Sequence, residues 1–355
     1  MTYVIHGTTG AQGAPVVAAL AAAGKTVTAL TRNPDAVVHG AQRVLAAGYT
    51  SAADLTDAYR GAEGVFIHLP VAPEEDRQTY AHNILTAVRE ARPDRVVFST
   101  SGFPIDPAIG GAAATLAAGL SDSGVSHAVI APELYLENLL MPHVIGSVRE
   151  RGVLPYPIRA DFPVSWTSHL DIADAVVALL DRTDVTGVVS VGQYPAITGP
   201  DLAEAFGTRL GREVVFDQIT AEEFRTSVTP LIGASAAADI AGAYQAMSAM
   251  PGRSIAPETS ARKLLGVTPG PQASGWPTSA SDHNRCQLPP SSPRLGRPPY
   301  STGGLPSLQL LSTARARTAS TARTPAGRST PPAPRLCELP HVSHQLPLYV
   351  GRSPA

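Results

Sequence analysis

Three glycines near the N-terminus have the spacing of a phosphate-binding turn. They occupy every third position of Gly7-Thr8-Thr9-Gly10-Ala11-Gln12-Gly13, between the β-rich run Tyr3–His6 and the alanine-rich stretch Gly13–Ala23. Gly7 can form the tight turn that leaves a strand, and Gly10 lets the backbone approach a pyrophosphate. Gly13 permits close packing of a helix, whose N-terminus offers free N–H groups. The pattern predicts a dinucleotide site made by Gly7, Thr9, Gly10, Ala11, Gln12 and Gly13.

The residues after the second expected strand indicate which dinucleotide binds. A site for NAD(H) normally has Asp or Glu there, to hold the ribose 2′-hydroxyl. This chain has Leu30-Thr31-Arg32 instead, and a guanidinium suits a 2′-phosphate through charge-assisted hydrogen bonds. We expect Arg32 to select NADP(H), with NAD(H) less favoured; the alternative is an ordinary exposed arginine. Further cofactor contacts are expected at two other strand ends, from Leu69, Pro70, Ser99 and Thr100.

The elements that position these residues alternate along the chain. The expected strands are Tyr3–His6, Thr26–Leu30, Val65–Leu69, Arg95–Ser99 and Ser126–Ala131, and the expected helices are Gly13–Ala23, Ala52–Tyr59, Asp76–Ala91 and Gly111–Ser121. Wholly apolar strands separated by helices indicate a parallel sheet covered on both faces, and right-handed crossovers make it doubly wound. The predicted fold class is therefore α/β, with a Rossmann-type sheet over residues 1–150.

The pattern changes after Ala131, where Pro132, Pro142, Pro155, Pro157 and Pro163 divide the chain into short pieces. The segments Asp171–Asp181 and Gly187–Val191 look like a helix and a strand that return to the sheet. The other segments of 151–270 predict a smaller, mostly helical substrate lobe: Gly199–Leu210, Glu213–Ile219 and 221–265. In such folds the substrate pocket is expected at the carboxyl ends of the strands.

The last segment, 277–355, has a different composition. It holds 14 prolines, nine arginines, no lysine and two acidic residues, a formal charge of +7 that leaves −9 on the rest. Such a segment buries too little apolar surface to offset chain entropy, so we expect a disordered tail, either a functional basic segment or a frame error. The acidic remainder argues against nucleic acid as its partner.

Cysteine usage and hydropathy exclude further classes. Both cysteines, Cys286 and Cys337, lie in the tail, so the rest of the chain has no disulfide scaffold, cysteine nucleophile or cysteine-ligated metal, and no metal site is predicted. Apolar stretches such as Ala14–Ala23 are too short to span a bilayer. A strand that starts at Thr2 leaves no room for a signal peptide, so a cytoplasmic location is expected.

Several segments resemble the NmrA-like group of atypical short-chain dehydrogenases, whose usual turn is Gly-Ala-Thr-Gly-x-x-Gly. The resemblance covers Thr2 to about Leu265, and its order of pieces is more specific than any single piece. Beyond the glycine turn the pieces are Thr31–Pro34, Leu55–Val65, Asn83-Ile84, Arg95–Gly102, Gly124–Asn138, Asp171–Ala173 and Leu202–Val214. One departure is Ala46-Ala47-Gly48, where the family usually has an Asp near the adenine.

The usual proton-transfer residues of short-chain dehydrogenases are absent. No Tyr-x-x-x-Lys exists anywhere, and Lys25 and Lys263 are the only lysines. The remaining catalytic candidates are Ser101, Tyr135 and His169, with Glu137 and Asn138 as further polar groups near the expected pocket. Asp171 reads as a helix N-cap and Glu133 as a solvated loop carboxylate.

Three functions fit the resemblance. The first is an NADPH-dependent oxidoreductase that positions a quinone-like or conjugated small molecule while the cofactor carries the hydride. The second is a non-catalytic NADP(H) redox sensor, like the NmrA regulator, that acts through a protein partner. The third is a defective remnant. A small-molecule substrate is the expected partner, with a homodimer or a regulatory protein as further possibilities.

Overall fold

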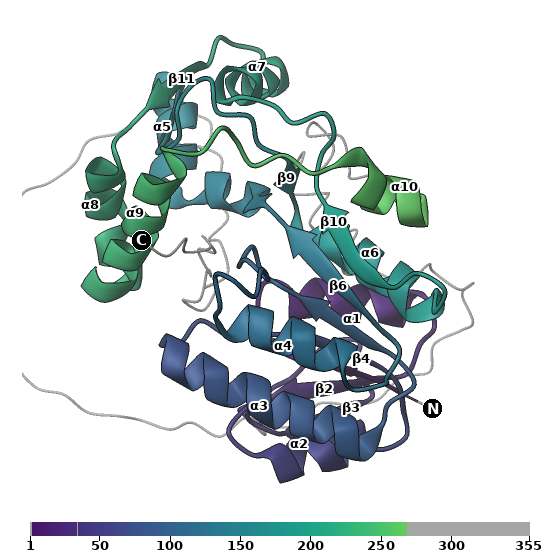
Figure 1. Ribbon diagram of the computed structural model, residues 1–355. Helices are drawn as coiled ribbons and strands as arrows, with labels where there is room; N and C mark the ends of the chain where they lie inside the picture. Colours follow the sequence, from purple (N-terminus) through teal and green to yellow (C-terminus); the bar gives the residue numbers. More distant parts are fainter. Residues whose placement is uncertain (1, 34, 268–355) are drawn as a thin grey trace, which may run out of the picture. The chain divides into compact units, whose positions relative to one another are not determined.

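A seven-stranded parallel sheet forms the centre of the computed structural model, which describes residues 2–33 and 35–267 (Figure 1). Its strands lie in the order β10-β6-β5-β4-β1-β2-β3. They are β1 (Thr2–Ile5), β2 (Val27–Thr31), β3 (Arg43–Ala46), β4 (Ala62–His68), β5 (Val96–Ser99), β6 (His127–Pro132) and β10 (Gly187–Val191). Because the strand order changes direction between β1 and β4, the sheet is doubly wound, and the predicted fold class is confirmed.

Strand β3 is missing from the sequence prediction. It pairs with β2 at the edge of the sheet, and both of its terminal residues, Arg43 and Ala46, are exposed. The wholly apolar run that marks a central parallel strand is therefore absent from this edge strand.

The two faces of the sheet alternate residue by residue and are covered by different helices. Tyr3 and Ile5 pack beneath α1 (Gly13–Ala22) and α6 (His169–Asp181), which contact each other. Val4 points to the opposite core, beneath α2 (Ala52–Tyr59), α3 (Glu74–Ala91) and α4 (Ala112–Ser121) (Figure 1). Burial on both faces explains why these strands are apolar throughout.

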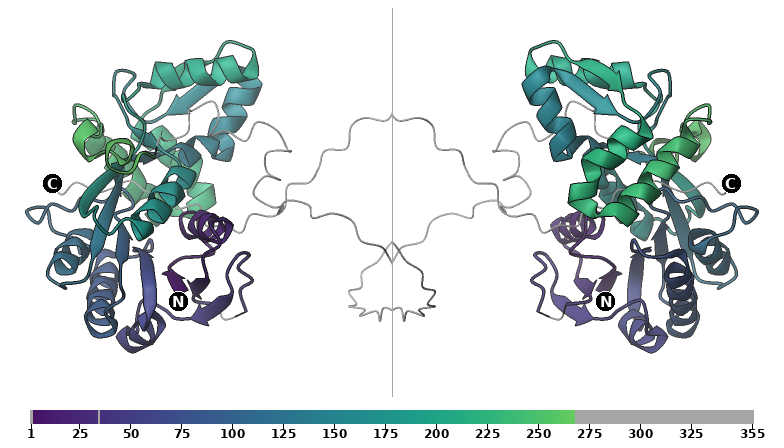
Figure 2. Two further views of the ribbon diagram at one scale, coloured as in Figure 1. Left: turned by 90° about the vertical axis from the view of Figure 1, so that its right-hand side faces the viewer. Right: turned by 90° about the vertical axis from the view of Figure 1, so that its left-hand side faces the viewer.

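A second core collects most elements after β6, seen as the teal and green segments in Figure 2. It contains the parallel pair β8 (Val153–Tyr156) and β11 (Val215–Gln218), with α5 (Pro142–Arg151), α7 (Gly199–Leu210), α8 (Ala221–Ile232) and α9 (Ala234–Met247). Pro142 marks a boundary between two elements, as expected, because η1 (Leu136–Leu140) ends just before it and α5 begins at it. It is the first residue of α5, where the missing N–H would have no helical partner.

A short parallel pair brings two distant segments together beside the main sheet. In β7 (Leu134–Tyr135) and β9 (Trp166–Thr167), Tyr135 pairs with Thr167. The chain then continues from β7 into the 3-10 helix η1 (Leu136–Leu140) and from β9 into α6. This pairing places the residues after Tyr135 near the start of α6.

The described chain ends with the 3-10 helix η2 (Pro257–Thr259) and α10 (Ala261–Leu265), both of which contact β10. None of the helices in 2–33 and 35–267 has the length and hydropathy needed to cross a membrane. The expected tail over 277–355 lies outside the described residues.

Candidate functional site

The glycine turn follows β1, and its glycines meet different surroundings. A Cβ on Gly7, whose φ is +60°, would lie 2.2 Å from Nε2 of His68. A Cβ on Gly13 would lie 2.3 Å from the carbonyl oxygen of Gly7, which confirms the close approach of α1 to the turn. A Cβ on Gly10 would meet one atom, the Gly7 carbonyl oxygen at 3.1 Å. The fold therefore requires glycine at 7 and 13, while a Cβ at 10 would make one tight contact with the turn backbone.

The start of α1 presents backbone donors. Its N-cap, Gln12, has no side-chain capping bond, and the N–H groups of Ala11 and Gln12 donate no hydrogen bond within the described residues. The Gly10 N–H bonds to the Gly7 carbonyl and shapes the turn. Free N–H groups at the positive end of a helix suit a phosphate group.

The side chain of Gln12 connects the turn to the end of β5. Its Oε1 accepts a hydrogen bond from Ser99 Oγ at 2.8 Å, and its Nε2 donates to Ser101 Oγ at 2.9 Å. All three residues are buried. Ser101 has φ +56°, a left-handed conformation that is uncommon outside glycine and marks local strain. Sequence reasoning placed Gln12 and Ser101 at the site but did not foresee that they bond to each other.

The ends of β2 and β4 flank the turn. Thr8 Oγ1 donates to the Leu30 carbonyl at 3.1 Å, while Arg32 is exposed directly after β2 and forms no ion pair with any residue in 2–33 or 35–267. Leu69 is buried and Pro70 half-buried after β4. Strands β5, β4, β1 and β2 are neighbours in the parallel sheet, so the predicted cofactor residues lie together at the carboxyl ends of these strands.

Aromatic groups adjoin Ala46-Ala47-Gly48, the stretch where the family has an Asp, because Tyr49 follows it directly. The ring of Tyr49 lies 5.1 Å from that of His6 and 5.5 Å from that of Tyr80, measured between centroids. Tyr49 Oη donates to the His68 carbonyl, and Asn83 Nδ2 donates to the Tyr49 carbonyl. Asn83, one of the residues that carry the family resemblance, therefore holds the segment at Tyr49 against α3.

A second polar group forms where η1 meets α6. The rings of Tyr135 and His169 stack with 4.7 Å between centroids. Glu137 Oε1 accepts the backbone N–H of His169 at 2.8 Å and lies 3.5 Å from its Nδ1. Glu137 Oε2 and His169 Nε2 are buried and make no hydrogen bond within the described residues. Two of the three catalytic candidates therefore meet here, while Ser101 belongs to the Gln12 group.

Burial shifts the pKa values of this second group in opposite directions. It lowers the pKa of His169 to about 4, with a smaller contribution from the charge of His68. It raises the pKa of Glu137 to about 7, against the backbone N–H of His169, and the charge of Asp171 adds to the rise. The imidazole is therefore neutral near pH 7, and the 3.5 Å contact is not an ion pair.

Two more buried histidines connect this group to the turn. Burial lowers the pKa of His68 to about 4 and that of His6 to about 3, and the charge of His68 contributes to the lowered pKa of both His6 and His169. His6 Nε2 forms a 2.6 Å hydrogen bond with Tyr59 Oη. His6 directly follows β1, and His68 is the last residue of β4. Sequence reasoning missed both as site residues, although each stands at a strand end.

Two interpretations from the sequence are wrong. Asp171 is not the N-cap of α6; Ser168 is, and Asp171 completes a capping box by accepting the Ser168 N–H at 2.9 Å. Glu133 is not solvated, because its Oε2 lies 2.6 Å from Nε of Arg253, whose Nη2 also donates to the Gly102 carbonyl. Arg253 is 120 residues away in sequence from Glu133, and nothing in the local pattern predicts this pair.

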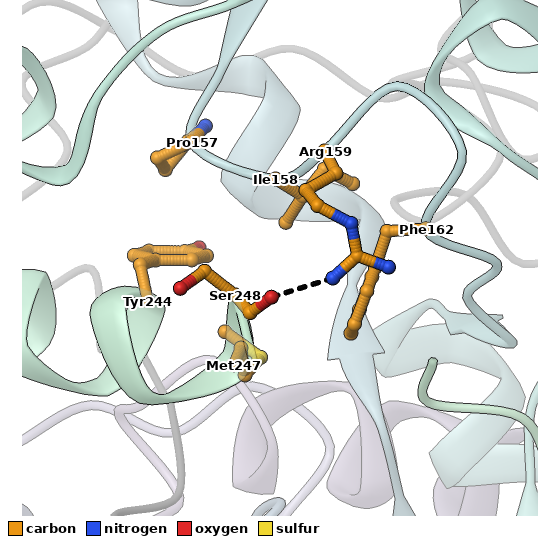
Figure 3. A pocket seen from close by; sticks show the side chains of 7 residues that line it. All are labelled: Pro157, Ile158, Arg159, Phe162, Tyr244, Met247 and Ser248. Atoms are coloured by element: carbon orange, nitrogen blue, oxygen red, sulfur yellow. Dashed lines mark hydrogen bonds between the residues drawn. The ribbon is translucent and has the colours of Figure 1, made fainter. Parts of the chain in front are cut away.

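Other parts of the molecule offer less. Helix α4 carries alanines where short-chain dehydrogenases place their tyrosine and lysine. A shallow depression is lined by Pro157, Ile158, Arg159, Phe162, Tyr244, Met247 and Ser248 (Figure 3). Arg159 spans it by donating to the Ser248 carbonyl at 2.6 Å, and none of the predicted site residues lines it. Among the described residues, no cluster of His, Cys, Asp and Glu could hold a metal ion.

A doubly wound parallel sheet with a glycine turn after its first strand defines a protein of the Rossmann class. A model of the NmrA-like family matches residues 2–262, so this chain belongs to the NmrA-like family, as the motifs predict.

Individual relatives share this fold. The chain is 29% identical over 237 residues to the NAD(P)H azoreductase of Xenophilus azovorans. The matched region covers 64% of this chain and 80% of the azoreductase. The NADP(H) complex of Citrobacter sp. triphenylmethane reductase matches with a TM-score of 0.65 and 18% identity, over 78% of this chain and 99% of that one. The NADPH complex of an Escherichia coli NADPH-dependent quinone oxidoreductase matches with a TM-score of 0.59 and 20% identity, over 78% and 98%.

Proposed function

We propose that this protein binds NADP(H) at the turn over residues 7–13 and reduces a small conjugated acceptor, such as an azo compound or a quinone. The glycine turn, with the free N–H groups of Ala11 and Gln12 at the start of α1, carries the first half of the proposal. His68 and the Gly7 carbonyl explain why the fold needs Gly7 and Gly13, whereas a Cβ at Gly10 would make one tight contact, 3.1 Å from the Gly7 carbonyl oxygen. A ligand that approaches the backbone closely would add a further reason for glycine at 10.

The residues present fit such a cofactor. The free N–H groups of Ala11 and Gln12, together with Thr9 and Gly13, would hold the pyrophosphate at the start of α1. Arg32 would bind the 2′-phosphate of NADP(H), since it is exposed and has no acidic partner among the described residues. The strand ends that carry Leu69, Pro70, Ser99 and Thr100 would contact the rest of the dinucleotide. When bound, the nicotinamide supplies the hydride.

The kind of substrate is suggested by the relatives, whose names describe reduction of azo compounds, quinones and triphenylmethane dyes. The nicotinamide would supply the hydride to such acceptors without the Tyr-x-x-x-Lys pair, which this chain lacks.

The test is NADPH oxidation by the purified protein with an azo dye, a quinone and a triphenylmethane dye, alongside a titration of NADPH binding by fluorescence. We expect saturable NADPH binding, weaker NADH binding, and turnover of at least one acceptor. Tight binding without turnover of any of the three would favour the redox-sensor function instead. Failure to bind NADPH would overturn the proposal.

A further inference from the structure

The contact between η1 and the start of α6 places the carboxyl group of Glu137, whose side chain is 25% exposed but whose Oε2 is buried, beside the buried imidazole of His169. Glu137 Oε1 is held by the His169 N–H, and Glu137 Oε2 makes no hydrogen bond in the described part of the chain. No described lysine or arginine forms an ion pair with Glu137. A carboxylate in this position lacks the partners that a buried charge needs, whereas a protonated carboxyl does not need them.

The imidazole of His169 extends this group. Its Nδ1 lies 3.5 Å from the Glu137 carboxyl, its Nε2 is buried without a partner among the described residues, and a charge on His68 would lower its pKa. His68 in turn packs against Gly7, the first glycine of the turn. A neutral imidazole can accept a proton at one nitrogen while releasing another from its second nitrogen.

We propose that Glu137 and His169 form the proton donor of this reductase, the function that the missing Tyr-x-x-x-Lys leaves open. The inference rests on the proposed function. As the hydride adds to one atom of the acceptor, the Nε2 proton of His169 moves to the adjacent reduced heteroatom and the carboxyl proton of Glu137 moves to Nδ1. Glu137 is left as a carboxylate and takes a new proton from water.

The environment of Glu137 sets how this donor depends on pH. Of the ionisable groups on the elements packed around it, Tyr135 is on β7, and α5 carries His143, Arg149, Glu150 and Arg151, while α6 carries His169, Asp171, Asp174 and Asp181. The charge of Asp171 adds to the raised pKa of Glu137. Burial raises the pKa of Glu137 to about 7. The donor is therefore loaded below pH 7 and lost as the pH rises above it, so reduction that needs a proton should slow at alkaline pH.

Two acceptors with different proton demands provide the test. An azo dye needs one hydride and one proton to become a hydrazo compound. A triphenylmethane dye cation is neutralised by hydride alone. In Glu137→Gln the ratio of azo to triphenylmethane rates should fall at least about 100-fold, the range of general acid catalysis. The alkaline decline of the azo rate should disappear, while NADPH affinity stays within about twofold. Glu150→Gln, an exposed carboxyl on α5, is the matched control.

Other measurements keep the outcomes distinct. His169→Phe, which keeps a ring against Tyr135, should lower the same ratio if Glu137→Gln fails to fold. The infrared carbonyl band of a protonated carboxyl, assigned by its loss in a folded Glu137 variant, should titrate near pH 7 in the wild-type protein even if no dye is turned over. Equal rate losses on both dyes, or an ionised Glu137 at pH 6, would overturn the proposal. Absence of NADPH binding would instead overturn the proposed function.

Discussion

Two polar groups near the strand ends differ in how completely their hydrogen bonds are satisfied. In the Gln12 group, both ends of the Gln12 amide bond to serine hydroxyls after β5. In the Glu137 group, Glu137 Oε2 and His169 Nε2 have no partner among the described residues. The three residues of the Gln12 group are buried, and so is His169, whereas the Glu137 side chain is 25% exposed although its Oε2 is buried.

The comparison suggests two kinds of task. A fully bonded buried network holds its members in one arrangement, which suits a turn that must receive a dinucleotide in a fixed place. Buried polar atoms without partners are costly, and persist where a ligand or a proton transfer uses them. We therefore assign the Gln12 group to cofactor binding and the Glu137 group to the acceptor and its proton.

The largest expected effect is at Gly10. Gly10→Val should lower NADPH affinity at least about 1,000-fold, about 4 kcal/mol, because a branched side chain would fill the space for the pyrophosphate. Calorimetric titration measures this, and thermal unfolding verifies the fold. The infrared titration of Glu137 should be unchanged, since the two groups are separate. Unaltered affinity in a folded variant would refute the assignment of the turn.

Arg32→Ala comes next. Loss of a charge-assisted bond to the 2′-phosphate should weaken NADPH binding by about 1.5–3 kcal/mol, or about 10- to 150-fold, with little change for NADH. Competition titrations with both cofactors give the ratio. If both affinities fell equally, Arg32 would be supporting the turn instead of recognising the phosphate.

The third effect is a pH dependence of stability. The folded pKa of His169, about 4, is below its unfolded value of 6.5, so its contribution is present above pH 6.5 and lost as the pH falls toward 4. Lowering the pH from 7 to 5 should reduce the free energy of unfolding by on the order of 2 kcal/mol from this group. In His169→Phe, the difference in the free energy of unfolding between pH 7 and pH 5, measured by urea unfolding at both pH values, should be smaller by that amount. His6, His68 and Glu137 are present in both proteins and contribute to the pH dependence of each. Identical pH dependence in the two proteins would contradict burial of a neutral His169.

The smallest expected effect is at Arg253, which fastens Gly102 beside the Gln12 group. Arg253→Ala leaves Glu133 half-buried without its partner and should lower the free energy of unfolding by about 1–2 kcal/mol. Arg60→Ala, which breaks the exposed pair with Asp57, is the control and should change it by less than about 0.5 kcal/mol. Arg253→Ala should weaken NADPH binding more than it alters the Glu137 titration. The opposite result would place Arg253 with the Glu137 group.

The parallel sheet and the glycine turn could be predicted from the amino-acid sequence. Strands buried on both faces must be apolar throughout, and glycines at 7 and 13 are demanded by contacts within a few residues or by a neighbouring strand, so their signal is local. The edge strand β3 gave a weaker signal because half of its residues are exposed. The cap of α6 was misassigned by three residues because Ser168 and Asp171 share one capping box.

Tertiary structure alone decided which polar residues meet. Tyr135 and His169 are joined only because β7 pairs with β9, and Glu133 reaches Arg253 across 120 residues. The pKa values of Glu137 and His169 are set mainly by burial, which depends on what the rest of the chain packs around them. A residue's type and its neighbours in sequence therefore predicted which groups could do chemistry. Long-range packing determined the ionisation states of Glu137 and His169.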